Sequence, residues 1–486
     1  MRRILSETSA LVARSFRDAV QAWNAFFLAP ADPTPLGAIR LIIGTLSCWN
    51  MIVYGMELRS FLGSTGWADP ATARELLPDG GWSFWFLVPD SLLWPAWGAC
   101  VAITFCFAIG LFSRTTAVLT WAILVSTAYR APVLLYGFDQ ILATWVFYLA
   151  ITGASGRAVS IDRFLDRYRR NRRDLAHRPG PKGWAPRSGS PPASVAANIA
   201  IRLIQLHLCM IYLFAGLSKL RGEPWWDGYA AAMILTTPEF SRFDLSWIAI
   251  DYPALVSLAT HATIVLEIGY AALVWNRKIR PWVLIAVAAM HVGIDLTLSL
   301  TEFALTMLAA NLAFVSGSWL RSLATGRDQP AGKVLYDGAC PRCRATMALV
   351  CAADPDHVIE PVDLTSVEVA SIHPRLSREA CMAAMHVVGR DGRVFAGYDA
   401  VMLLLAWTPL TSPLSILRFV PGVAPIGRRV YNWIAATRPR DVPCTDLACG
   451  IHPPSVKRGE SVKTPRAGRT TDDPRPTSAQ SGRTKR

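Results

Sequence analysis

The sequence predicts a multi-pass α-helical membrane bundle of about eight spans, followed by a small α/β domain. Hydrophobic residues make up 52% of the 486 residues and charged residues only 17%, whereas soluble domains carry about 25% charged residues. The apolar residues gather in runs long enough to cross a bilayer. After Arg327 the composition changes to that of a soluble domain. These observations exclude a single soluble enzyme as the whole protein.

The expected membrane domain covers residues 36–322, with an amphipathic segment in residues 1–35 before it. Apolar periodicity and turn residues divide it into eight runs, of which the third is short enough to be a tilted or partial span. The expected spans are 36–54, 92–112, 116–129, 132–152, 197–217, 254–275, 281–300 and 303–320.

Basic residues are distributed so that eight spans place every strong cluster on one side of the membrane. These clusters are the N-terminus, the loop at 154–195, the turn at 276–280 and the C-terminal tail. The positive-inside rule then predicts an integral membrane protein with both termini cytoplasmic and Lys219 on the outer side. The same rule accounts for the net charge of +14, so the lipid bilayer is the expected partner and no nucleic acid is.

A soluble unit is expected over residues 330–443, and a disordered basic tail over 453–486. A strand leads into a cysteine motif from which a helix leaves. The pattern then predicts a strand at 357–362, a helix at 377–385 and a hairpin of 386–389 with 394–397. Asp391 and Gly392 form the expected hairpin turn.

The cysteine motif runs from Asp337 to Cys343 and contains the pair Cys340 and Cys343 at CxxC spacing. A helix N-terminus stabilises a thiolate, and Arg342 adds positive charge nearby. We expect Cys340 to be the more exposed, attacking thiol and Cys343 the resolving thiol. A zinc site and unrelated thiols remain as alternatives. Zinc needs a second pair, which the scattered remaining cysteines do not offer as CxxC, so no metal site is expected.

The motif DGACPRC, followed by VVGRDGRVFAGYDA and YNWIAATR, resembles the DCC family of thiol-disulfide oxidoreductases over residues 333–440. The resemblance implies a thioredoxin-like fold, protein-disulfide reductase activity with Cys340 and Cys343 as the redox pair, and a thiol or disulfide substrate. Asp337, Tyr398 and Asp399 match recurring positions of that family. One departure from thioredoxins is that no proline stands just before the strand at 386–389.

Lys219 ends the fifth apolar run and is followed by Trp225 and Trp226. Such a lysine either snorkels to the headgroups within an aromatic belt, or is desolvated and acts as a base. Asp139 lies within the fourth run, and Glu267 within the sixth reads as a structural or cavity-lining group. His291 and Asp295 are four residues apart on one helix face and either fix helix packing or line a cavity.

The stretches LSKLRGEPWWDGYA, SGRAVSID and HVGIDLTLSLTEFALTMLAANLAF resemble the HTTM family, over residues 30–320. This is the membrane domain shared with vitamin K-dependent gamma-carboxylase. The resemblance implies that Lys219 is a base acting on a reduced quinone and that His291 is the matching histidine of a later helix. Asp139 and Gln140 fall where the family has an asparagine and a histidine. The chain also lacks the family's large lumenal domain.

These observations predict a membrane-bound thiol-disulfide oxidoreductase whose CxxC domain is tethered to a carboxylase-like membrane domain that binds a lipid-soluble quinone or quinol. One alternative is a quinol-dependent carboxylase or epoxidase-like membrane enzyme, with Lys219 as base and an accessory redox domain. The other alternative is a non-enzymatic membrane scaffold or transporter.

Overall fold

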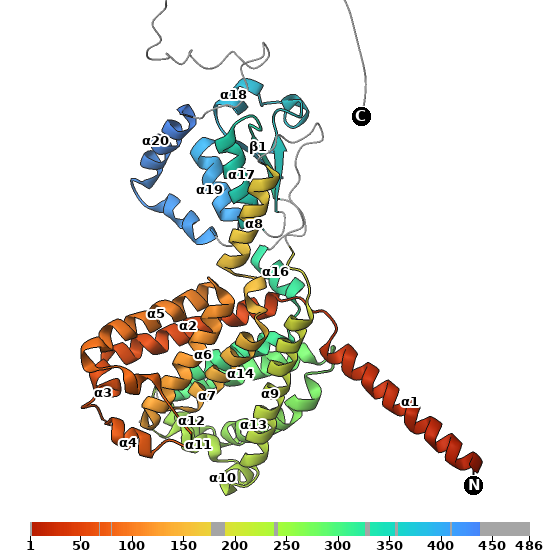
Figure 1. Ribbon diagram of the computed structural model, residues 1–486, viewed down its shortest axis with the longest axis vertical. Coiled ribbons are helices and arrows are strands. Elements are labelled where there is room, and N and C mark those ends of the chain that lie inside the picture. The colour runs from red at the N-terminus through yellow and green to blue at the C-terminus, as the bar shows by residue number, and fades with distance from the viewer. Residues whose placement is uncertain are drawn as a thin grey trace, which may run out of the picture. The chain divides into compact units, whose positions relative to one another are not determined.

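The described chain is mostly helical and contains one small mixed β-sheet (Figure 1). The computed structural model describes residues 2–67, 69–78, 80–175, 190–237, 242–325, 331–354, 358–408 and 411–437. The tail expected at 453–486 lies outside these residues.

Among the described residues, five helices are long and apolar enough to cross a membrane. They are α2 (Thr34–Met56), α5 (Leu93–Ile109, extended by η2, Asp90–Leu92), α9 (Val195–Lys219), α13 (Pro253–Leu273) and α14 (Arg280–Leu298). A sixth candidate is broken: α15 (Thr301–Asn311) with η5 (Leu312–Phe314) turns by 117° into α16 (Gly317–Thr325). The sequence placed one span at 303–320, whereas the chain bends inside that range.

Helices α6 (Ser113–Arg130) and α7 (Gly137–Thr152) pack against each other within the same bundle. They fall short of the apolar length and composition of the other spans, so the count of eight stays a prediction. Helix α7 begins five residues later than the expected span, after the short turn η3 (Pro132–Leu134). Asp139 therefore lies in its first turn, where its carboxylate accepts a hydrogen bond from Tyr136 N at 2.9 Å, and not inside a span as expected.

The other helices of this half lie outside the bundle's long spans. Helix α1 (Arg2–Phe27) lies within the amphipathic segment expected at 1–35, and its Phe16 and Trp23 are exposed, as a surface amphipathic helix requires. The remaining short elements are α3 (Leu58–Leu62), α4 (Pro70–Glu75), η1 (Phe84–Leu87), η4 (Ser155–Arg157), α10 (Glu223–Trp226), α11 (Ala230–Leu235) and α12 (Ser246–Asp251).

Arg40, on α2, is a fully buried cation. Its guanidinium donates to the carbonyls of Phe107 and Ala108 at 2.8 Å each, and to the carbonyl of Val159. A buried charge is costly unless polar groups surround it, so these carbonyls must stay in place. Arg40 thereby ties α2 to the end of α5 and to the turn before helix α8 (Ile161–Asp174).

The C-terminal unit is built on a four-stranded sheet in the order β2-β1-β3-β4. Strands β1 (Gly332–Tyr336) and β2 (Ile359–Asp363) are parallel, whereas β3 (His386–Gly389) pairs antiparallel with β1 and with β4 (Val394–Ala396). The predicted hairpin is confirmed, with Gly392 at φ +75° in its turn. The helices of this unit are α17 (Pro341–Ala353), η6 (Val369–Ser371), α18 (Arg378–Ala383), α19 (Gly397–Trp407), η7 (Ser412–Phe419) and α20 (Val423–Ala436).

Helix α8 comes from the loop between α7 and α9, yet it packs along α17 (Figure 1). Leu175, directly after α8, is buried in one cluster with Val334 and Met347 of the C-terminal unit. Asn171 is also buried and donates to the Ala348 carbonyl at 3.4 Å. The basic segment expected to be a solvated loop at 154–195 thus contributes a helix to the core of this unit. Residues 176–189 lie outside the described residues.

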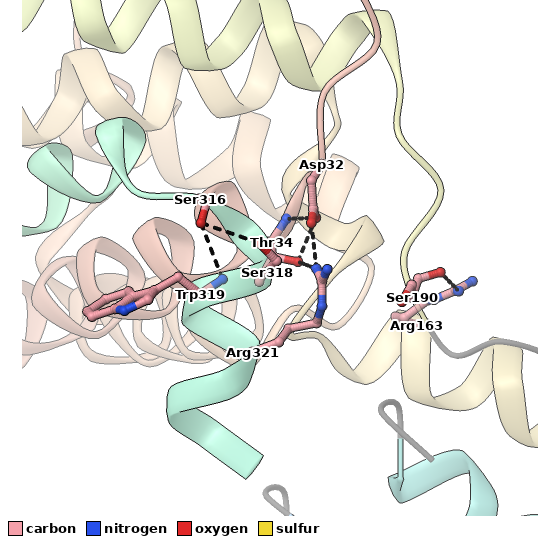
Figure 2. Close-up of polar contacts among 8 residues, drawn as sticks. All are labelled: Asp32, Thr34, Arg163, Ser190, Ser316, Ser318, Trp319 and Arg321. Carbon is pink, nitrogen blue, oxygen red and sulfur yellow. Dashed lines mark hydrogen bonds and ion pairs between the residues drawn. The ribbon is translucent and has the colours of Figure 1, made fainter. Parts of the chain in front are cut away.

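Asp32 precedes α2 and joins it to α16 (Figure 2). The carboxylate accepts hydrogen bonds from Thr34 N at 2.9 Å and Thr34 Oγ1 at 2.7 Å, and it forms an ion pair with Arg321 at 2.5 Å. Arg321 also donates to Thr34 Oγ1 at 2.7 Å. Ser316 caps the start of α16 by accepting from Trp319 N. The contact fixes the broken end of the bundle to the start of its first long helix.

Removing the Leu175 side chain should loosen the C-terminal unit, although Leu175 precedes that unit by over 150 residues in the chain. We expect Leu175→Ala to cost about 2–5 kcal/mol, because it leaves a cavity among packed apolar side chains. Hydrogen exchange of the β1 and α17 amides should accelerate at least tenfold, by the relation of about 1.4 kcal/mol to each factor of ten. Arg172→Ala, on the exposed side of α8, is the control. Unchanged exchange in Leu175→Ala would show that α8 is not part of the core.

The Asp32 contact should stabilise the protein only while its carboxylate is ionised. Burial raises the pKa of Asp32, but hydrogen bonds from Thr34 and Arg321 outweigh burial and leave the pKa below its ordinary value. The stabilisation is therefore complete above the unfolded-state pKa and disappears as the pH falls through the lower folded-state pKa. Asp32→Asn should lower stability by roughly 1 kcal/mol at pH 7, since the pair is partly exposed, and by less at pH 3. Thermal unfolding in detergent at both pH values tests this, and an equal loss at pH 3 would contradict it.

Candidate functional site

Cys340 is the N-cap residue of α17, immediately after the loop that leaves β1. Its Sγ accepts a hydrogen bond from Cys343 N at 3.2 Å, and Pro341 occupies the first helical position, where no donor is needed. Neither cysteine forms a disulfide. The helix N-terminus and this N–H group favour negative charge on the Cys340 sulfur.

The exposure of the two thiols is the reverse of what the sequence suggested. Cys340 is 0% exposed, whereas Cys343 is partly exposed. The reason is local, because a capping Sγ must turn back onto the first helical turn to meet the Cys343 N–H. Cys343 is therefore the thiol that a ligand can reach.

The loop before Cys340 is held by two buried carboxylates. Asp337 accepts from Ala339 N at 3.0 Å, and Asp363 accepts from Gly338 N at 3.1 Å. A Cβ on Gly338 would collide with the Asp363 carboxylate, so glycine is needed there. Sequence reasoning missed Asp363. The signal was its place at the end of β2, because parallel strands bring their carboxyl ends to the same edge of a sheet.

Cys343 opens onto a pocket of about 210 Å³ whose lining is mainly apolar. Met385, which precedes β3, and helix α20 contribute to the lining together with α17. The lining residues are Leu335, Tyr336, Asp337, Arg342, Cys343, Thr346, Met347, Cys381, Met385, Val401, Tyr431, Ile434 and Ala435. Burial raises the pKa of the Cys381 thiol in this pocket and that of Cys351 behind it, so both stay protonated at neutral pH.

Helix α20 reaches the pocket because it is fastened to α19 and β3. The Tyr431 hydroxyl accepts from Met385 N at 2.8 Å. Gly427 lies so close to the Tyr398 ring that a Cβ there would collide with it. Arg428 forms an exposed ion pair with Asp399 at 3.3 Å. Tyr398 and Asp399 therefore hold α20 in place and do not contact the cysteines in the described interactions.

Arg342 also connects the redox loop to α20. Its guanidinium donates to Thr437 Oγ1 at 3.1 Å, just beyond the end of α20. Arg344 donates to the Gly338 carbonyl at 2.9 Å and so holds the loop from the other side. The two arginines place positive charge around the start of α17. Arg342 also lines the pocket.

In the membrane half, Lys219 at the end of α9 meets Glu267 on α13. Lys219 Nζ bonds both carboxylate oxygens, at 2.9 and 2.8 Å, and lies 5.1 Å from the centroid of the Trp225 ring. The side chains are 21% and 8% exposed, so the pair is largely removed from solvent. The sequence did not predict this pairing, because the two residues lie 48 positions apart on different helices.

His291 belongs to a separate network. Its Nε2 lies 2.8 Å from the Tyr212 hydroxyl, which also accepts from Asn311 Nδ2 at 3.3 Å. Tyr270 donates to Asn311 Oδ1 at 2.8 Å. Sequence reasoning missed these partners, although Tyr212 is seven residues before Lys219 and Tyr270 three after Glu267, which places each pair on one helix face. The structure brings Lys219 to Glu267 and His291 to Tyr212.

Asp295 and Asp139 lie apart from both networks. Asp295 accepts from Thr301 Oγ1 at 2.6 Å and meets Arg242 at 3.5 Å. Asp139 accepts from Asn50 Nδ2 at 3.2 Å and lines a pocket of about 830 Å³ whose described lining contains neither Lys219 nor His291.

Two family models match the chain. Residues 334–441 match DCC1-like thiol-disulfide oxidoreductase. Residues 191–319 match the HTTM domain. The two follow one another in the order that the motifs predicted, although the HTTM match begins well after residue 30. Comparisons with curated proteins and with solved structures found no match.

The matched ranges divide the site residues between a membrane part and a redox part. The HTTM range contains Lys219, Glu267 and the Tyr212–His291–Asn311 network. The DCC1-like range contains both cysteines, and with the apolar helices it marks a redox-related membrane protein that acts on thiols or disulfides. Among the described residues, no group of three His, Cys, Asp or Glu side chains could hold a metal ion.

Proposed function

We propose that this chain is a membrane-bound thiol-disulfide oxidoreductase in which Cys340 and Cys343 reduce a substrate disulfide. One observation carries the proposal: a thiol that caps a helix and accepts the Cys343 N–H stands beside a second thiol that opens onto a pocket. The strand, helix, strand and hairpin around them agree with a thioredoxin-like unit.

In the proposed reaction, the Cys343 thiolate attacks one sulfur of the substrate disulfide. A Cys343 mixed disulfide forms, and the other half of the substrate leaves as a thiolate that takes a proton. Cys340, whose negative charge the helix N-terminus favours, then attacks the Cys343 sulfur. The second half of the substrate leaves as a thiol. The cysteine pair is oxidised to a disulfide and the substrate is reduced to two thiols.

We propose that the redox unit, residues 330–443, is tethered to a multi-pass membrane domain of eight spans over residues 36–322. Both termini of the chain would be cytoplasmic. The apolar helices and the bent pair supply six of these spans, and α6 and α7 pack among them. The basic face of α8, the turn after α13 and the N-terminus would then share the cytoplasmic side. A reducing cytoplasm would keep the resting cysteine pair as a dithiol.

A second candidate function assigns chemistry to the membrane part. In it, Lys219 acts as a base on the hydroxyl of a lipid-soluble quinol, and Glu267 is its ion-pair partner. The observation that favours it is the nearly buried Lys219–Glu267 pair, because a charged pair within a membrane domain usually serves a function. Glu267 would stabilise the ammonium that forms when the neutral Lys219 amine takes the proton of the quinol hydroxyl.

The order of attack gives a direct test. Cys343→Ser should abolish disulfide exchange, because the reachable thiol is lost. Cys340→Ser should leave Cys343 able to attack but unable to be resolved, so a mixed disulfide should accumulate that non-reducing mass spectrometry detects. Cys106→Ser is the control, since its partly exposed cysteine lies on α5, outside the lining of this pocket. Trapping in Cys343→Ser instead would make Cys340 the attacking thiol. Undiminished exchange in both variants would overturn the redox function.

For the second candidate, Lys219→Arg is the informative change. Arginine keeps the pairing with Glu267, so expression and thermal stability should hold, but it cannot lose its proton near neutral pH. Quinol oxidation by dissolved dioxygen, in the presence of the purified chain, should therefore fall at least 100-fold, which is the usual contribution of a general base, about 10²–10⁴. Arg221→Lys, two residues further on, is the control. An unchanged rate of quinol oxidation in Lys219→Arg would show that Lys219 is not the base and has only a structural role.

A further inference from the structure

The pocket beside Cys343 is small, and its lining has an apolar part and a charged part. Its volume of about 210 Å³ lies below the roughly 300–1,000 Å³ of sites that take drug-sized ligands. Met347, Val401 and Ile434 supply apolar walls, whereas the charged Asp337 and Arg342 belong to the loop and helix start. Such a cavity accommodates one short apolar or aromatic group next to the sulfur, and little more.

The backbone polar groups of Met385, which lines the pocket with Cys343, already have hydrogen-bond partners. Met385 lies directly before β3 and lines the pocket with Cys343. Its N–H donates to the Tyr431 hydroxyl at 2.8 Å, and its carbonyl accepts from Gly397 N at 2.9 Å. An extended polypeptide binds by adding a strand, which requires free backbone donors and acceptors at the edge. Neither polar group of Met385 is free for that purpose.

Helix α20 is fixed where it blocks such a strand. Three contacts along its length hold it: Gly427 against the Tyr398 ring, Arg428 with Asp399, and Thr437 with Arg342. Close packing at Gly427 leaves no room to slide the helix. The wall formed by Tyr431 and Ala435 is therefore part of the site.

We infer that the substrate of the Cys340–Cys343 pair is a small, apolar, low-molecular-weight disulfide that enters the pocket end-on, and that extended polypeptide disulfides are excluded by α20. This inference rests on the proposed function and specifies its substrate class. The apolar half of the disulfide lies among Met347, Val401 and Ile434, which places its sulfur at Cys343. Exchange then proceeds as described, with the pair oxidised and two small thiols released.

The test compares two disulfides on the reduced full-length chain in detergent. The probes are 4,4′-dithiodipyridine, which is small, neutral and aromatic, and insulin, whose disulfides join two polypeptide chains. Each rate is divided by the rate with free dithiothreitol, which removes the intrinsic reactivity of the disulfide. We expect the normalised rate for dithiodipyridine to exceed that for insulin by about 100-fold, a discrimination of roughly 2.7 kcal/mol.

Two variants of α20 and one control variant on the same helix test how this helix selects the substrate. Ala435→Trp should fill the pocket and reduce the dithiodipyridine rate at least tenfold, as exclusion of a fitted group does. Val430→Trp, on the half-exposed side of the same helix, should leave it unchanged. Tyr431→Ala removes the hydroxyl that occupies Met385 N–H, and it should raise insulin reduction about tenfold by restoring a strand-binding donor. Thermal unfolding of each variant confirms that it folds.

The possible results separate the two proposals. If both Cys340→Ser and Cys343→Ser keep both rates, the redox function itself fails. If Cys343→Ser loses both rates while the wild-type chain reduces insulin as fast as dithiodipyridine, the redox function stands and the substrate class is wrong. An Ala435→Trp variant with an unchanged dithiodipyridine rate would also overturn the substrate class, because the pocket would then play no part in binding.

Discussion

The buried guanidinium of Arg40 is the constraint from which the two halves of the structure follow. A cation without solvent must be surrounded by acceptors, and the acceptors it finds are the carbonyls at the end of α5 and at Val159. Those carbonyls fix the turn from which α8 starts. Asp162, in the first turn of α8, accepts from the backbone of Phe112 and Ser113 and holds the same junction. Helix α8 then carries Asn171 and Leu175 into the core around α17.

The redox site is completed by segments that flank its sheet in the chain. Helix α8 supplies part of the core behind α17, and α20 supplies the wall in front of Cys343. Tyr398 and Asp399, which recur in the motif, serve to hold α20 through Gly427 and Arg428. The chemistry of the CxxC pair is therefore local, whereas access to it depends on packing between distant elements.

The polar residues of the membrane half follow the same principle in apolar surroundings. Charged and hydrogen-bonding groups there must find partners, because water is not at hand. Lys219 meets Glu267, and His291 meets Tyr212, which Asn311 links to Tyr270. The two networks share α9 and α13 and so tie both helices to the broken segment at α15. The stability of the membrane half, and any reaction that it catalyses, therefore depend on the side chains of these two networks.

The sequence by itself determined the two-part organisation, the long apolar helices, the hairpin at Gly392 and the CxxC motif at a helix start, because each depends on periodicity or spacing within a short stretch. Only the tertiary structure decided which thiol is reachable, that Asp139 lies in a first turn and that α8 joins the redox core. It also decided that Lys219 pairs with Glu267 and that α20 closes the pocket. The last three features depend on side chains dozens to hundreds of positions apart, and their pairing is settled by packing and by the cost of unpaired buried polar groups, which no local pattern records.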